Sequence, residues 1–158
     1  MRNYLGRYMT KSFMLVTGLL LVSASVWAHH GQGNSYDIDN LWTTWATITE
    51  FNYRNPHPSI KFDRTVSTGE VEHWVAEVAN NPSRLAREGW PKRRSEEALA
   101  PGTRVKLYIA TARRGGFSGV VEKIENEQGE NVANTSEPIP EAVDLDGVPG
   151  GYNPAANK

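Results

Sequence analysis

Residues 45–90 read WATITEFNYRNPHPSIKFDRTVSTGEVEHWVAEVANNPSRLAREGW, and their apolar spacing changes part-way from that of strands to that of a helix. Alternation with a period of two residues predicts three strands. They are expected at about 45–53, 60–66 and 71–79. The first should end at Asn55-Pro56-His57-Pro58, because proline cannot donate to a strand ladder. A hairpin turn at residues 67–70 should separate the other two.

The spacing changes to that of a helix after the third strand. Asn81-Pro82-Ser83 predicts a helix start and Gly89 predicts its end, with a second helical turn at residues 95–99. Two further strands are predicted at about 105–109 and 120–124. The turns expected around them are Pro101-Gly102 and the stretch 113–116.

Three strands, a short helix and two strands (β-β-β-α-β-β) form the order of a mainly β, OB-like five-stranded barrel. The alternative is an open five-stranded α+β sheet with the same order. We favour the barrel because the first strand is long and apolar on more than one face, with Trp45, Thr47 and Thr49 on one side and Ile48 opposite Phe51. The tryptophans at 42, 45, 74 and 90 are expected mainly in the core or at the barrel ends.

The first 28 residues predict a cleaved secretory signal with its own helix. Three basic residues are followed by an apolar run from Phe13 to Val22 and by small residues up to Ala28. That run is about half the roughly 20 residues of a membrane-spanning helix, so we expect no membrane span after cleavage. The predicted location is periplasmic or secreted, with His29 as the new amino terminus.

Composition sets the expected limits of the domain. Residues 29–40 are polar and predict a flexible segment, and residues 41–133 form the predicted domain. Residues 134–158 are rich in Pro and Gly and predict a disordered C-terminal tail. Removing a tail that buries little should leave the thermal unfolding midpoint nearly unchanged.

Charge and cysteine content narrow the classes of function. The chain has a net charge of −1, and loss of a signal with three basic and no acidic residues leaves about −4, which argues against a nucleic-acid binder. The absence of cysteine excludes disulfides, a thiolate nucleophile and covalent haem attachment. No complete catalytic set can be named, so an enzyme ranks behind a binding protein.

Several motifs occur in a characteristic order along the chain. They are Ala28-His29-His30, Asn55-Pro56-His57, Trp74-x-x-Glu77, Leu85-x-x-x-Gly89-Trp90 and APGTRVKLY at 100–108. This order resembles that of a family of short exported bacterial proteins of unknown function, whose members carry a Pro-Gly-Asp in the last motif. Thr103 stands in place of that Asp, and Gly31 stands where the family usually has Ser. The resemblance implies export and fold, and no activity.

Five residues are candidates for ligand binding. Glu77 lies among apolar neighbours and is either partly buried opposite an arginine or, as we favour, a salt-bridged edge carboxylate. Arg113 and Arg114 occupy a turn, where they could hold an anionic ligand or an acidic partner. Trp74 and Trp90 could stack on a ligand, although a core role is favoured.

A second group of basic residues lies in the helical region. It consists of Arg84, Arg87, Lys92, Arg93 and Arg94. Acidic residues are interspersed among them, so a charged outer helix face is favoured over a binding surface.

The histidines suggest a metal site. Cleavage after Ala28 would give His29 an α-amine and an imidazole, which together chelate a metal through two nitrogens. A third nitrogen from His30 or His57 would complete the nitrogen-rich set that Cu(II) favours. The alternative class is a non-metal OB-like interaction module that binds a small molecule, a glycan or an exported protein partner.

Overall fold

The computed structural model describes residues 31–134 and 138–150, and the chain divides into two units, residues 1–34 and 35–158. The short helix α2 (Gly31–Ser35) spans the boundary between the units. The remaining elements are β1 (Trp42–Asn52), β2 (Ser59–Thr65), β3 (Val71–Val78), α3 (Pro82–Arg87), α4 (Lys92–Ala98), β4 (Arg104–Thr111), β5 (Ser118–Glu125), β6 (Asn131–Asn134) and β7 (Val143–Asp144). The predicted order of strands and helix is confirmed, with β6 and β7 in addition. None of the helices in the two described ranges has the length and apolar character needed to cross a membrane.

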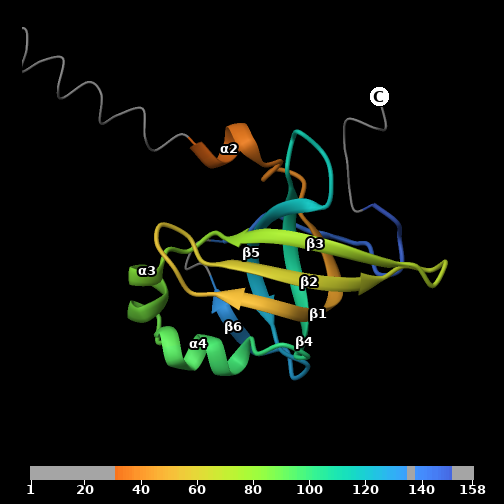
Figure 1. The fold of residues 1–158 in the computed structure, drawn as a ribbon. Coiled ribbons are helices and arrows are strands. Elements are labelled where there is room, and N and C mark those ends of the chain that lie inside the picture. The colour runs from red at the N-terminus through yellow and green to blue at the C-terminus, as the bar shows by residue number, and fades with distance from the viewer. Residues whose placement is uncertain (1–30, 135–137, 151–158) are drawn as a thin grey trace, which may run out of the picture. The chain divides into compact units, whose positions relative to one another are not determined.

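The barrel closes because β1 is long enough to pair with two neighbours. Residues 42–47 pair with β4 and residues 47–52 pair with β2, both antiparallel. β3 is antiparallel to β2 and parallel to β5, and β5 returns to β4 (Figure 1). The resulting circuit is β1-β2-β3-β5-β4-β1, a closed five-stranded barrel in OB order. Closure excludes the open sheet.

A bulge in β1 changes which side chains face the core. Ala46 and Ile48 are buried, whereas Thr47 and Thr49 are exposed. The register shifts between Ile48 and Glu50, so the alternation moves by one residue and Phe51 packs against the same core as Ile48. The expectation that Phe51 faces away from Ile48 is therefore wrong. Simple alternation cannot reveal an inserted residue.

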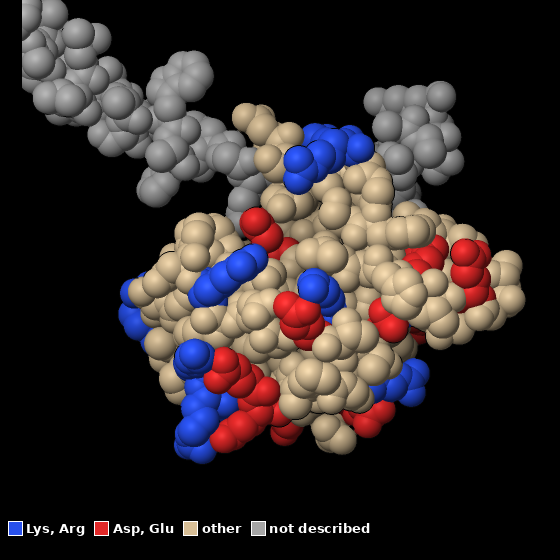
Figure 2. Space-filling model, in the orientation of Figure 1, with Lys and Arg blue, Asp and Glu red and all other residues tan. Residues whose placement is uncertain are grey.

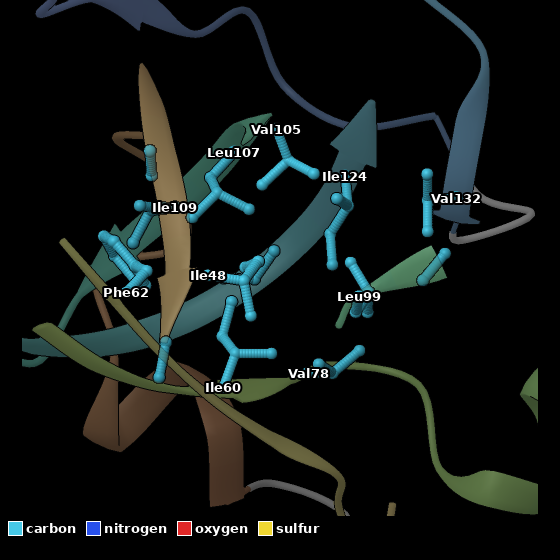
Figure 3. Packing of buried hydrophobic residues seen from close by; sticks show 14 of the residues in the cluster. Ile48, Ile60, Phe62, Val78, Leu99, Val105, Leu107, Ile109, Ile124 and Val132 are labelled. Carbon is cyan, nitrogen blue, oxygen red and sulfur yellow. The ribbon is translucent and has the colours of Figure 1, made fainter. Parts of the chain in front are cut away.

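Large aromatic side chains fill much of the barrel interior. Trp42 and Trp74 are both fully buried, with ring centroids 5.2 Å apart and planes at 60°. Phe62 stacks on Trp74 at 6.1 Å, and aliphatic residues such as Ile48 and Leu107 complete the cluster (Figure 3). The core assignment is confirmed for Trp42 and Trp74. Trp45 and Trp90 are only half-buried.

The helical segment between β3 and β4 begins and ends where the sequence predicts. The Asn81 side chain accepts a hydrogen bond from the Arg84 backbone N–H at 2.9 Å, which satisfies one of the unpaired donors at the helix start. Gly89 follows the helix with a positive φ of 86°, a conformation that glycine adopts without strain. Leu85 of α3 and Leu99 after α4 join the core cluster, so both helices are held against the barrel (Figure 1).

Residues 36–40, expected to be flexible, pack on the barrel. Tyr36 forms a β-bridge with Ala112, and Tyr36 and Ile38 pack on a second apolar cluster that includes Leu41. Asp37 is buried, and its carboxylate accepts hydrogen bonds from the Asn40 amide. Two alternating apolar side chains, a β-bridge and a buried aspartate thus hold this segment against the barrel.

Part of the expected C-terminal tail also contacts the barrel. β7 pairs in parallel with β1, with Val143 opposite Trp42, and Ile139 and Ala142 pack on the second apolar cluster. The packed region therefore extends beyond the expected limits of 41 and 133. Composition did not predict this packing, because many of the contacts of the tail are made by its backbone, as in the pairing of β7 with β1. Residues 1–30, 135–137 and 151–158 lie outside the described residues, and the predicted signal falls there.

Candidate functional site

A pocket of about 400 Å³ lies on the outer face of β1, β2 and β3, next to the loop that joins β4 to β5. The charged and hydroxyl groups that line it include Tyr36, Glu50, Arg54, Lys61, Glu77 and Arg114. Figure 2 shows this side of the barrel, where basic and acidic side chains are interspersed over the strands. The pocket is therefore a polar site with charges of both signs.

Strand alternation directs these side chains outward. On β2, Ile60 and Phe62 are buried, so the intervening Lys61 points to solvent. On β3, Trp74 and Ala76 lie in the core cluster, so Glu77 is exposed. The same alternation that builds the core places the pocket lining.

Glu50 is neutralised by its neighbours. Lys61 Nζ donates to Glu50 Oε2 at 2.6 Å, and the Asn52 amide donates to Oε1. The hydrogen bond from Lys61, followed by that from Asn52, holds the pKa of Glu50 below its usual value. The negative charge of Glu50 is therefore already balanced by Lys61, so it repels an anion in the pocket less strongly.

Glu77 has a tyrosine partner. Burial, followed by the charge of Glu77 and a hydrogen bond to it, raises the pKa of Tyr36, whose hydroxyl therefore donates to this carboxylate at neutral pH. Arg114 acts in the opposite direction on the pKa of Tyr36 and so lies within electrostatic reach. Glu77 is exposed, and within residues 31–134 and 138–150 it forms no ion pair, neither with an arginine at a partly buried position nor as the salt-bridged edge carboxylate that the sequence favours.

The two arginines of the pocket differ from the two acids. Arg54 follows β1 in the loop to β2, and Arg114 lies in the loop between β4 and β5; both are exposed. Neither guanidinium has an ion-pair partner within the part of the chain that the structure describes. The adjacent Arg113 instead contacts Asp37, with Nη2 3.3 Å from Oδ1. Arg114 is therefore the residue of the predicted Arg113-Arg114 pair that faces the pocket.

The two tryptophans suggested for ligand stacking lie elsewhere. Trp74 is inside the barrel, and its Nε1–H donates to Glu72 Oε2 at 2.9 Å. Trp90 is half-buried beneath Arg94, whose guanidinium lies 4.1 Å from the ring centroid. Neither ring lines the pocket, so a stacking role at this site is not supported.

The basic helical residues mostly pair within their own helices. Arg84 lies 3.0 Å from Glu88, Lys92 lies 3.7 Å from Glu96, and Arg93 lies 2.9 Å from Glu97. These are pairs four residues apart on exposed helix faces. The arrangement fits the charged outer face that the sequence favours.

The predicted copper ligands are only partly visible. His29 and His30 lie outside the described residues. His57 is half-buried in the β1–β2 loop, and its Nδ1 is buried with no hydrogen-bond partner among the described residues. Among residues 31–134 and 138–150, no three His, Cys, Asp or Glu side chains come together in a way that could hold a metal ion. His73 lies 2.7 Å from Asp63 in an exposed pair.

The pocket residues of β1, β2 and the loop between them were not predicted from the sequence; they include Glu50, Arg54 and Lys61. Lys61 could have been predicted to face solvent, because it lies between Ile60 and Phe62, which face the core. The partner across β1 could not be inferred, because the bulge after Ile48 changes the register that brings Glu50 opposite Lys61.

Comparison with known proteins identifies one family. A family model described as "Family of unknown function (DUF6152)" matches residues 17–122. The chain belongs to this family. The match covers β1 to β4, both intervening helices and most of β5, including the pocket residues named above, and the family description assigns no activity. No curated protein and no solved structure matches the chain.

Proposed function

We propose that the protein is an exported binding protein for a small polar molecule with an anionic group, held in the pocket on β1, β2 and β3. The observation that carries the proposal is the unequal pairing of charges in that pocket. Glu50 is bonded to Lys61 and Asn52, and Glu77 to Tyr36. Arg54 and Arg114 have no such partner among the described residues. The unbalanced charge of the site is positive.

Fold and pocket size support the same ligand class. OB barrels bind ligands on the face of strands 2 and 3, with help from the loops that follow strands 1 and 4. Arg54 and Arg114 lie on those two loops. A guanidinium presents a planar fork of donors that matches a carboxylate or a phosphate. A volume of about 400 Å³ lies near the lower end of small-molecule sites, which suits a single sugar acid or a short dicarboxylate.

An NMR titration tests this proposal. Succinate, glucuronate and phosphate are added to the ¹⁵N-labelled protein, with glucose as a neutral control. We expect the anions to shift amide signals around the pocket, and the Arg54→Gln/Arg114→Gln variant to weaken their binding about tenfold or more. The exposed Arg87, outside the pocket, provides a matched control as Arg87→Gln. Equal binding of glucose and glucuronate, or equal weakening by Arg87→Gln, contradicts an anion site.

Export rests on the signal-like residues 1–28. We expect protein recovered from the exporting host to have an intact mass that begins at His29. A mass that retains Trp27 and Ala28 contradicts this cleavage and removes the free α-amine on which a copper site depends.

Copper binding is the second candidate function. The observation that favours it is the Nδ1 of His57, which no hydrogen bond commits to another group within residues 31–134 and 138–150. Calorimetric titration of Cu(II) compares the cleaved protein, a form with one extra residue before His29, and His57→Ala. The amino-terminal chelate predicts that the extra residue abolishes tight binding, and a contribution from His57 predicts weaker binding in His57→Ala. Tight binding that survives the extra residue contradicts the chelate.

A further inference from the structure

An ion pair lies inside one end of the barrel. Arg64 of β2 and Glu72 of β3 are register partners, with Nε 3.4 Å from Oε2 and side-chain exposures of 0% and 6%. The guanidinium carbon lies 5.0 Å from the centroid of the Trp42 ring, and Trp74 Nε1–H donates to Glu72. Arg64 and Glu72 thus occupy inward-facing positions of their strands, where the alternating pattern would place apolar side chains.

The C-terminal residues 143–150 cover this pair, and we call them the strap. Arg64 Nη2 donates to the carbonyls of Leu145, at 3.2 Å, and Val148. The backbone N–H of Gly150 donates to Glu72 Oε1. The ion pair therefore meets the strap through main-chain acceptors and a main-chain donor, which every peptide possesses.

The strap also completes the edge of β1. The first half of β1 pairs with β4 on one side, and on its other side it takes β7, because β2 pairs only from Thr47 onward. The Leu145 N–H donates to the Thr43 carbonyl at 2.9 Å, and the Ser67 N–H donates to the Gly147 carbonyl. The strap thus bridges the gap where β1 and β2 diverge. Addition of an extended segment to an open strand edge is a common mode of peptide recognition.

Three strap residues add specificity to these backbone contacts. Leu145 packs against the core cluster. Asp146 Oδ1 accepts hydrogen bonds from the Trp45 N–H at 2.8 Å and the Thr44 hydroxyl at 3.1 Å. Gly147 has a φ of 77°, a backbone conformation that residues other than glycine rarely adopt. By contrast, Val143 and Val148 remain about half exposed, at 51% and 45%.

The ion pair is not needed to fill the barrel. Replacement of a buried pair by apolar side chains of similar volume is often neutral or stabilising. Moreover, Arg64 Nη1 is buried and has no hydrogen-bond partner in the described part of the chain, so the strap residues 143–150 leave part of the donor capacity of Arg64 unused. A binding role explains a charged pair at this position better than packing does.

We propose that this end of the barrel is a groove for an extended peptide with an apolar-acidic-glycine core, and that the strap is a displaceable internal occupant of it. The partner is an extended segment of another protein that offers main-chain acceptors to Arg64, a main-chain donor to Glu72 and a carboxylate to the Trp45 N–H. The groove is separate from the pocket that contains Arg54 and Arg114, and binding there is independent of it.

A labelled peptide of residues 141–150, EAVDLDGVPG, tests the groove on the full chain. Asp146→Asn in the protein replaces a carboxylate with a neutral amide oxygen, which accepts the Trp45 and Thr44 hydrogen bonds less strongly. Peptide binding should tighten about tenfold over wild type, because the internal competitor is weakened. Glu141→Gln is the matched control, because Glu141 is exposed and lies two residues before the strap. It should bind the peptide as wild type does. A peptide with Asn in place of its second Asp should bind about tenfold more weakly.

Failure to bind either protein, or equal binding of the Asp and Asn peptides, overturns the proposal. Hydrogen exchange on the wild-type chain provides a second measurement that does not depend on a variant. The amides of Ser67 and Leu145 should exchange about tenfold faster or more than that of Ile48, because the strap opens without unfolding the barrel. Exchange of all three at one rate shows that the strap is a fixed part of the fold and also overturns the proposal. Arg54→Gln/Arg114→Gln should leave peptide binding unchanged.

Discussion

Two ion pairs involve basic residues of the same strand, three positions apart, yet they lie in opposite environments. Lys61 points outward and contacts Glu50 at 2.6 Å, with side-chain exposures of 52% and 44%. Arg64 points inward and contacts Glu72 at 3.4 Å, where almost no surface is exposed. The shorter contact is the weaker one in its effect on folding, because water screens exposed charges and competes for their hydrogen bonds.

The comparison shows that burial, more than distance, determines the consequence of losing a partner. Without Glu50, Lys61 is simply hydrated. Without Glu72, the Arg64 guanidinium remains in the barrel interior with a charge that water cannot reach. Burial lowers the pKa of Arg64, and Glu72 and then Asp146 act against that shift, so both carboxylates favour the charged form of the guanidinium.

Removing the buried acid should give the largest effect. We expect Glu72→Ala to lower the free energy of unfolding by about 3 to 5 kcal/mol, since it leaves Arg64 uncompensated. Urea denaturation measures this difference. The double variant Arg64→Met/Glu72→Leu should recover most of the loss, because it removes both charges and fills the same space. A cost below about 1 kcal/mol for Glu72→Ala would show that Arg64 reaches water and is not buried as described.

Removing the strap should have an intermediate effect. Deletion of residues 135–158 takes away the carbonyl partners of Arg64 and the Asp146 contacts, but it admits water to the pair in exchange. We expect the free energy of unfolding to fall by about 1 to 3 kcal/mol. Thermal unfolding measures the change. Composition alone predicts an unchanged midpoint, so that result would restore the expectation of a tail that buries little.

Most of the barrel could be predicted from sequence, because short local patterns specify its strands, turns and helix start. Alternation around Trp74, Ala76 and Val78, the Asn81-Pro82 helix start and the turn at Gly69 specify each element by itself, and their order specifies the OB circuit. The buried pair could not be recognised in this way, although Arg64 occupies the inward phase between Phe62 and Val66. A charged residue at such a position suggests a misassigned strand unless its partner across the hairpin is also considered.

The strap and the pocket share a different obstacle. Their residues come from distant parts of the chain, such as Asp146 beside Trp45, or Tyr36 beside Glu77. Pairings of this kind depend on how strands and terminal segments come together, which no local pattern records. The predicted Glu77 and Arg114 belong to the pocket, but their neighbours on β1 and β2 emerge only from the fold.

The exposed pair should give the smallest effect, and it separates electrostatics from stability. The pKa of Glu50 is lowered chiefly by the hydrogen bond from Lys61, so Lys61→Met should raise it toward the ordinary value of 4.5. An NMR titration of the Glu50 carboxyl carbon measures the midpoint. A folded pKa below the unfolded value contributes stability above about pH 4.5, and this contribution is lost as the pH falls through the folded pKa.

At neutral pH the same variant should lose, in urea denaturation, only the small stability that is linked to the lowered pKa of Glu50, because Asn52 still donates to Glu50 and water replaces the ammonium group. One molar salt should raise the wild-type pKa of Glu50 in the same direction but by less, because it screens the charge of Lys61 and leaves the hydrogen bond in place. A clear loss of stability in Lys61→Met at neutral pH would contradict the comparison. Such a loss would mean that water has little access to Lys61 and Glu50 on the outer face of β2, as it has little access to Arg64 inside the barrel.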